Sequence, residues 1–338
     1  MARQYCGALG KIANCQVVVT AGYSVDESTE SRPLHWPVSA RLYLPRAWGV
    51  DRKRRSPAHI PEHLPFRTKP ELALELVDQA RAWQVPFKAV VADAGYGSNP
   101  SFLAGLEKRQ VSYVCGVERT FGLRLPDEVQ AASAQPLPEY RGIGRPRLPR
   151  PAPLHTAEAI SQAAPQETWR TVTWRDGTKN TLCKQFVAIR AHRATGNPAQ
   201  GRRSGHSRLS TGPQGWLLAE RPIPGHDGDV KWYYSSLPPD TPLERLVALA
   251  HSRWVIEQFY EDAKGECGLR DFQGRRWDGL HRHLALVMLT YSFLMQQRQL
   301  ASNGSEGGLF PLQNSPDAPS GAPSSAAISG AGPGRVAY

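Results

Sequence analysis

Apolar residues recur along the first third of this chain with two different spacings. β-Branched residues dominate positions 14–21, and apolar and polar residues alternate over 35–44, so both segments are predicted to be strands. Apolar positions three and four residues apart predict a helix over 68–83, and a further helix is predicted over 100–109. Strands followed by helices interleaved with strands indicate the α/β class.

A short apolar run from Phe87 to Ala92 ends on Asp93, directly before Ala94-Gly95-Tyr96-Gly97. Such a run is typical of a strand buried in the middle of a sheet, and a second strand is predicted over 112–117. Open α/β sheets place ligands beside a side chain that leaves the carboxyl end of a central strand. Asp93 is therefore a candidate functional carboxylate. The alternative is an aspartate that only caps a helix or forms a turn.

Residues 241–264 are predicted to form one helix. Thr241 and Glu244 have the spacing of a capping box, in which each side chain accepts from the backbone of the other residue. Pro242 suits the first helical position, and Gly265 is a natural stop.

Arg253, Glu257 and Lys264 share one side of this predicted helix. At about 100° per residue, Glu257 lies roughly 40° round from Arg253, and Lys264 roughly 20°. A carboxylate between two cations suits a group that holds a metal ion while its neighbours hold phosphates. The alternative is a ladder of surface salt bridges.

Changes in composition and in hydrophobic pattern along the chain predict four parts. Residues 1–120 and 215–300 contain the regular strand and helix patterns, and we interpret them as two parts of one core. Residues 121–214 are Pro-, Arg- and Gly-rich around a strand-like centre, which predicts a β-rich insertion with flexible flanks. Residues 301–338 are rich in Gly, Ser, Pro and Ala, which predicts a low-complexity disordered tail.

The chain is strongly basic, because 41 Lys and Arg residues outnumber 30 Asp and Glu residues and give a formal net charge of +11. This balance favours a polyanion as partner, and nucleic acid is commoner than a membrane surface. Residues 46–67 are predicted to be a basic loop that contains Arg52-Lys53-Arg54-Arg55. Such a run is either simply solvated or in contact with phosphates.

The five cysteines are widely separated and include no C-x-x-C pair, which argues against a zinc ribbon and against a disulfide framework. The sequence contains neither a signal peptide nor an apolar run long enough to span a bilayer. We therefore expect a reduced protein of the cytoplasm with no membrane partner.

Several of these segments together resemble a known family. Arg253-Trp254-x-Ile256-Glu257, followed by Lys264-Gly265 and Gly268-Leu269, resembles the YREK signature of bacterial insertion-sequence transposases. Asp93-Ala94-Gly95-Tyr96-Gly97 is similar to the segment that carries their second catalytic aspartate. The likeness extends over roughly residues 3–298, and the order and separation of the segments make it specific.

These transposases are DDE enzymes, so the resemblance implies an RNase H-like mixed sheet flanked by helices, with the β-rich insertion between Asp93 and the Glu257 helix. It implies hydrolysis and strand transfer at DNA phosphodiesters by two Mg²⁺ or Mn²⁺ ions. Asp93 and Glu257 match the second and third acidic residues, and are implied as catalytic residues and metal ligands. The expected DNA-binding residues are the signature's two cations and the three arginines that follow them, namely Arg253, Lys264, Arg270, Arg275 and Arg276.

The implied partner is double-stranded DNA, both at the terminal inverted repeats of the transposon and at the target, which places the protein on the nucleoid. A homodimer is left open. The family's first catalytic aspartate lies upstream of the segment matched here by Arg3-Gln4-Tyr5. Because the sequence starts at Met1, we expect an N-terminally truncated transposase with impaired catalysis. The alternatives are a non-catalytic DNA-binding relic that inhibits a full-length transposase, and a stand-alone nuclease that uses the same two carboxylates.

Overall fold

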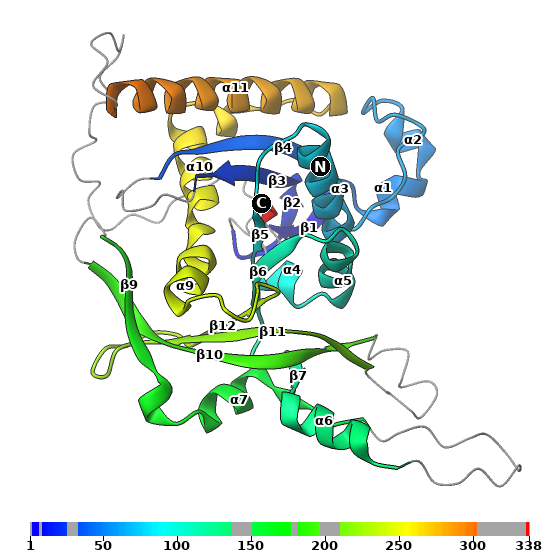
Figure 1. Cartoon of the computed structure of the whole chain (residues 1–338). Coiled ribbons are helices and arrows are strands. Elements are labelled where there is room, and N and C mark those ends of the chain that lie inside the picture. Colours follow the sequence, from blue (N-terminus) through cyan, green and yellow to red (C-terminus); the bar gives the residue numbers. More distant parts are fainter. Residues whose placement is uncertain are drawn as a thin grey trace, which may run out of the picture. The chain divides into compact units, whose positions relative to one another are not determined.

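The computed structural model of the chain describes residues 2–6, 9–25, 33–136, 151–176, 181–196, 210–302 and 336–337. The chain forms two compact units, and Figure 1 shows their elements. The first unit joins Met1–Phe87 to Ser252–Tyr338, and the second unit is Lys88–His251. Each unit packs helices on parallel and antiparallel strands. The predicted α/β class with a mixed sheet is thus confirmed, and it is consistent with an RNase H-like fold.

In the first unit, β3 runs antiparallel to β4 and parallel to β13, while β1 and β2 pair as a separate hairpin. The predicted strands at 14–21 and 35–44 correspond to β3 and β4. The elements of this unit are β1 (Ala2–Cys6), β2 (Lys11–Cys15), β3 (Val17–Ser24), β4 (His35–Tyr43), α1 (Arg46–Val50), α2 (Arg52–Arg55), α3 (Lys69–Ala82), α10 (Trp254–Gly265), the 3-10 helix η2 (Leu269–Asp271), α11 (Trp277–Ser302) and β13 (Val336–Ala337).

Helices cover both faces of the β3–β4 pair. Val18 and Ala40 pack with Phe259 and other buried residues of α10 and α11, and Figure 1 shows α11 lying along β4. On the other face, the Ser39 hydroxyl donates to the Oε1 atom of Gln79 in α3 at 2.7 Å. Because side chains alternate across a strand, one short pair of strands supplies both contacts. This arrangement places α10, the helix that carries Glu257, on a buried core.

The helix predicted over 68–83 is observed as α3. Thr68 is its N-cap and forms a capping box with Glu71, in which each side chain accepts from the other residue's backbone N–H. Hydrogen bonds from the backbone N–H and the hydroxyl of Thr68 hold the pKa of Glu71 below its usual value. The sequence pattern therefore located the start of this helix correctly.

The basic segment 46–67, predicted to be a loop, is not one throughout, because α1 and α2 lie within it. Arg55 in α2 is buried, and its guanidinium donates to the backbone carbonyls of Gly49, Pro61, Glu62 and Leu64. A cation engaged by four carbonyl groups ties this segment together. Arg55 is therefore a structural residue. Of the four residues in the basic run, this one is not available to contact a phosphate.

In the second unit the strand order is β5-β6-β12-β11-β10-β7-β8, and β9 pairs with β10. The predicted strand 112–117 is β6, and the predicted helix 100–109 is α5. The elements of this unit are β5 (Ala89–Ala92), α4 (Ala94–Gly97), α5 (Pro100–Lys108), β6 (Ser112–Val117), β7 (Gly122–Arg124), α6 (Pro126–Ala134), β8 (His155–Thr156), α7 (Ala157–Ala163), the 3-10 helix η1 (Gln166–Thr168), β9 (Arg170–Asp176), β10 (Thr181–Thr195), β11 (Ser210–Arg221), β12 (Lys231–Ser235) and α9 (Leu243–Ser252).

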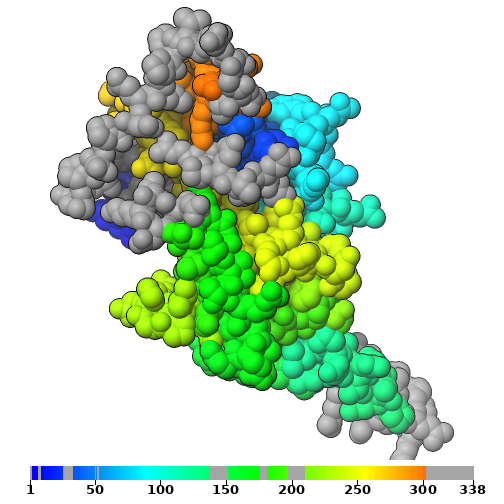
Figure 2. Space-filling view, turned by 60° about the vertical axis from the view of Figure 1, so that its left-hand side comes forward, coloured from blue at the N-terminus to red at the C-terminus, as the bar shows by residue number. Residues whose placement is uncertain are grey.

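The segment predicted to be a β-rich insertion contributes strands to the same sheet as β5 and β6. β10 pairs with β11 from Gln185↔Arg221 to Thr195↔Ser210, and β11 pairs in turn with β12. The segment also contains the helices α6 and α7, and Figure 2 shows the surface of α6 in teal beside the green strands. Its predicted flexible flanks and most of the predicted tail lie outside the described residues.

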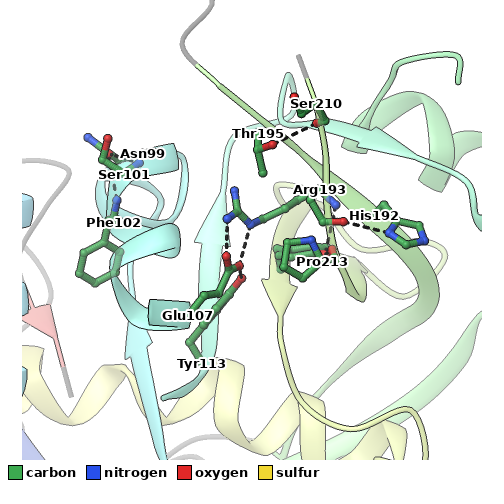
Figure 3. Close-up of polar contacts among 12 residues, drawn as sticks. Asn99, Ser101, Phe102, Glu107, Tyr113, His192, Arg193, Thr195, Ser210 and Pro213 are labelled. Atoms are coloured by element: carbon green, nitrogen blue, oxygen red, sulfur yellow. Dashed lines mark hydrogen bonds and ion pairs between the residues drawn. The ribbon is translucent and has the colours of Figure 1, made fainter. Parts of the chain in front are cut away.

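A buried ion pair attaches β10 to the rest of the second unit. The guanidinium of Arg193 donates from Nε to Oε1 of Glu107 at 2.7 Å and from Nη2 to Oε2, as Figure 3 shows. The hydroxyl of Tyr113 donates to the same carboxylate at 2.9 Å. These residues come from β10, α5 and β6, so charge pairing joins three elements that are distant in the sequence.

The single helix predicted over 241–264 is observed as two, because the helical hydrogen bonding is interrupted at Arg253 between α9 and α10. The predicted capping box is also wrong in its partners. The Thr241 hydroxyl donates to the carbonyl of Pro238, and the Glu244 carboxylate pairs with Arg170 of β9. The break falls next to the boundary of the two compact units, since the second unit ends at His251.

Candidate active site

Asp93 directly follows the buried strand β5 and lies in the second unit. β5 runs parallel to β6, with Ala89 opposite Ser112 and Ala92 opposite Cys115. Val90 and Val91 are buried, so side chains of this strand lie in the core. Asp93 thus leaves the carboxyl end of a strand in a parallel pair, as the sequence pattern indicated.

The Asp93 side chain also caps the short helix α4. Its Oδ1 atom accepts from the backbone N–H of Gly95 at 2.9 Å, so the alternative interpretation as an N-cap is observed too. The two roles are compatible, because a carboxylate has two oxygens and about four acceptor positions. Burial raises the pKa of the neighbouring Cys115 thiol, and the charge of Asp93 adds to that increase.

Close packing fixes the turn after Asp93. A Cβ atom at Gly97 would overlap the carbonyl oxygen of Gly116 in β6 and would lie 2.7 Å from Cβ of Cys115. Tyr96 is fully buried, with its ring centroid 5.3 Å from that of Phe102. Glycine is therefore required at position 97 by close approach of the backbone, and this packing holds the Asp93 carboxylate in place.

Glu257 lies in the first turn of α10, in the first unit, with 48% of its side chain exposed. The Nη2 atom of Arg253 donates to Glu257 Oε1 at 2.7 Å, four residues away. The surface salt bridge that the sequence left as an alternative is therefore present for this pair. An exposed ion pair of this kind is weak, so Glu257 can exchange partners at small cost.

The buried face of α10 holds Glu257 in place. Ile256, Phe259 and Ala263 are buried against β3, β4 and α11. On an adjacent face, the hydroxyl groups of Tyr260 and Thr20 lie 2.7 Å apart in a hydrogen bond. These contacts leave the Arg253–Glu257 pair on the exposed side of the helix.

The remaining cations of the predicted site follow in the same unit. The Nζ atom of Lys264 lies 5.8 Å from the ring centroid of Tyr260, in the last turn of α10. Arg270 and Arg275 are exposed, and within the described part of the chain neither side chain makes an ion pair or a hydrogen bond. Arg276 is different, because it donates to His59 Nδ1 and pairs with Asp278 at 3.4 Å.

The two predicted carboxylates belong to different compact units, Asp93 to the second and Glu257 to the first. Carboxylate oxygens are the ligands that Mg²⁺ and Mn²⁺ prefer, so these residues fit such an ion in kind. They do not complete a site in number, because no group of three or more His, Cys, Asp or Glu side chains is arranged to hold a metal in the described residues.

A third acidic residue, Glu220 in β11, has an environment that the sequence did not reveal. It is fully buried, and its carboxylate pairs with Lys184, with His251 at 2.9 Å and with the Tyr233 hydroxyl at 3.1 Å. Burial favours the protonated form, but the bonds and charges of His251 and Lys184 outweigh it and lower the pKa of Glu220 to about 2. The signal available in the sequence was a lone Glu directly after the apolar stretch Trp216–Ala219.

Comparison with known proteins shows which family the chain belongs to. The profile of the DDE superfamily endonucleases matches residues 1–181, more than half of the chain. The chain belongs to this superfamily. Its members cleave DNA and generally use divalent metal ions, so a transposase or nuclease type of function is supported. A search of curated proteins finds no match.

The matched range divides the predicted site. Asp93 and the β5–α4 turn lie inside residues 1–181, so the superfamily match includes this half of the site. Glu257 and the five predicted DNA-binding residues lie beyond the matched range. Within the described residues, no helix combines the length and apolar character needed to cross a membrane.

Proposed function

We propose that this chain is an insertion-sequence transposase of the DDE superfamily that acts on phosphodiester bonds at transposon ends. The observation that carries the proposal is the position of Asp93, which leaves the carboxyl end of β5 within the range that the superfamily matches. Glu257 is the second acidic residue of the proposed site. The proposed partners are the terminal inverted repeats and the target DNA, and the proposed location is the nucleoid in the cytoplasm.

Asp93 and Glu257 would hold Mg²⁺, which when bound stabilises charge on phosphate oxygens and lowers the pKa of bound water. Arg253 and Lys264 flank Glu257 on α10, where they would pair with phosphates of the DNA backbone. Breaking the Arg253–Glu257 pair frees a cation for a phosphate and a carboxylate for the metal. The exposed side chains of Arg270 and Arg275 extend this basic surface.

Impaired catalysis is part of the proposal. Mg²⁺ takes six ligands in octahedral geometry, and two carboxylates fill fewer of these positions than three do. A loosely held ion costs rate, because the reaction depends on accurate placement of the reacting groups. We therefore expect slow, Mg²⁺-dependent nicking rather than complete transposition by this polypeptide.

The test is a nicking assay with purified protein, Mg²⁺ and a supercoiled plasmid that carries the DNA flanking the chain's own gene. Asp93→Asn and Glu257→Gln should each abolish nicking, because each removes a ligand. Glu261→Gln is the matched control, since Glu261 is also exposed on α10 and has no proposed role. A plasmid without the flanking DNA separates a transposase from a stand-alone nuclease.

Each outcome decides a different part of the proposal. Nicking that persists in both Asp93→Asn and Glu257→Gln refutes the assignment of the site. Rapid cleavage and joining by the unaltered chain refutes the impairment. No nicking, together with duplex binding in EDTA that weakens steeply with salt, supports the non-catalytic DNA-binding alternative, which the net charge of +11 favours.

A further inference from the structure

Helix α11 carries apolar residues on two opposite sides. One side is buried against β3, β4 and α10, and consists of Leu280, Leu284, Val287, Tyr291 and Met295. The other side is exposed, with exposed fractions of 64% for Leu286, 68% for Leu289, 48% for Phe293 and 42% for Leu300. Part of α11, in orange, is visible at the surface in Figure 2. A helix that is apolar on both sides is normally buried on both.

The exposed residues follow the spacing of a helix–helix seam. From Leu286 the steps are three to Leu289, four to Phe293, three to Gln296 and four to Leu300. This is the alternation of a and d positions in a coiled coil, with Gln296 as the one polar member. At about 100° per residue these positions fall within an arc of roughly 80°, roughly opposite the buried side. We call Leu286, Leu289, Phe293, Gln296 and Leu300 the α11 seam.

The charge of the surrounding surface indicates what kind of partner the seam accepts. Residues 283–297 contain no Lys, Arg, Asp or Glu, and the positions beside the seam are small or uncharged. DNA needs cations at its interface, and the nearby stretch from Arg253 to Arg276 supplies them instead. Two identical uncharged seams can meet without repulsion between like charges, because the flanking positions that set partner choice carry none.

We propose that the α11 seam is the surface through which two copies of this chain associate. The contact is isologous, with the same residues of both copies meeting about a twofold axis. The chain's own residues 303–335 offer only Leu309, Phe310, Leu312 and Ile328 as large apolar side chains, which do not match the heptad spacing of the seam. The dimer does not depend on DNA, so it is independent of the proposed reaction.

Analytical ultracentrifugation of the full chain without DNA, at 0.5 M NaCl, tests this proposal. We expect a dimer at micromolar concentration. High salt should not dissociate the dimer, because the contact is apolar. Leu289→Glu places a charge in the seam and should raise the dissociation constant at least 100-fold. Ile12→Glu is the matched control, since Ile12 is 64% exposed in the same unit but lies outside the seam.

Both variants change exposed residues, so their circular dichroism should equal that of the unaltered chain. A chain that stays monomeric throughout the micromolar range, or a Leu289→Glu variant that dimerises normally, would overturn the proposal. A Leu309→Glu/Phe310→Glu variant checks whether the tail covers the seam. Increased binding of an apolar dye by that variant, with a monomeric parent chain, would also overturn the proposal and assign the seam to the tail.

Discussion

Two Arg–Glu pairs of this molecule have the same chemistry and opposite surroundings. Arg193 and Glu107 in the second unit have 3% and 21% of their side chains exposed, against 29% and 48% for Arg253 and Glu257 in the first unit. The first pair is bidentate and also accepts from Tyr113, whereas the second is held by one hydrogen bond. Water is what distinguishes them, because it screens the exposed charges and replaces a lost partner.

The difference separates structural charges from available ones. Burial alone would lower the pKa of Arg193, but its hydrogen bonds and ion pair with Glu107 outweigh that effect and raise it. Neither member of that pair can leave without stranding a charge. Glu257 has no such constraint, and a carboxylate that changes partners cheaply is suited to binding a metal or to releasing an arginine for DNA.

The largest expected effect is at the buried pair. Arg193→Met keeps the length of the side chain but leaves the Glu107 carboxylate without its cation, which should cost about 3–5 kcal/mol of unfolding free energy. Urea unfolding of Arg193→Met measures it. The double variant Arg193→Met/Glu107→Leu should recover most of the loss, because no buried charge remains. A single variant that loses less than about 1 kcal/mol would show that water reaches this pair.

A smaller effect is expected for Glu220 in acid. Its folded-state pKa of about 2 lies below the ordinary value of 4.5, so its contribution is complete above pH 4.5 and is lost as the pH falls toward 2. A shift of this size corresponds to about 3 kcal/mol. Glu220→Gln should therefore flatten the dependence of stability on pH between 4.5 and 2, as measured by urea unfolding. An unchanged acid limb would mean that other carboxylates govern it.

The smallest effect is expected at the exposed pair. Arg253→Gln removes an i,i+4 salt bridge at the surface, which is worth about 0.3–0.5 kcal/mol. The urea midpoint should shift within that range, while the slope of the transition stays the same. A loss above about 1.5 kcal/mol would erase the contrast with Arg193 and would make the Arg253–Glu257 pair a structural one.

The sequence predicted correctly those elements whose formation depends on residues within a single helix or strand. The helix that starts at Thr68, the alternation along β4 and the strand that ends on Asp93 each depend on residues within one element, and the structure contains all three. The break at Arg253 has no such signal, since its residue types favour a helix on both sides. The break coincides with the change from one compact unit to the other. That boundary depends on contacts between residues far apart in the chain, so a local stretch of sequence cannot reveal it.

The charges that the sequence did not explain were those whose partners lie outside their own helix or strand. Arg55 belongs to a run of four basic residues that is usually solvated, yet its guanidinium donates to carbonyls six to nine residues away, from Gly49 to Leu64. Glu107 and Arg193 are 86 residues apart and gave no common pattern. For the proposed site, a strand and a glycine turn predicted the position of Asp93 at the end of β5, whereas spacing alone could not choose between a salt bridge and a metal ligand for Glu257.

The discontinuity of the first unit has a consequence for synthesis. Its β3–β4 pair leaves the ribosome early, but the helices that cover Val18 and Ala40 come from residues beyond 251, after the whole second unit. At about 5–20 residues per second, the intervening stretch takes on the order of 10–40 s to make. During that interval the second unit can fold completely, while the face of the strand pair that carries Val18 and Ala40 stays exposed. The nascent chain should therefore depend on chaperones mainly for its first 87 residues.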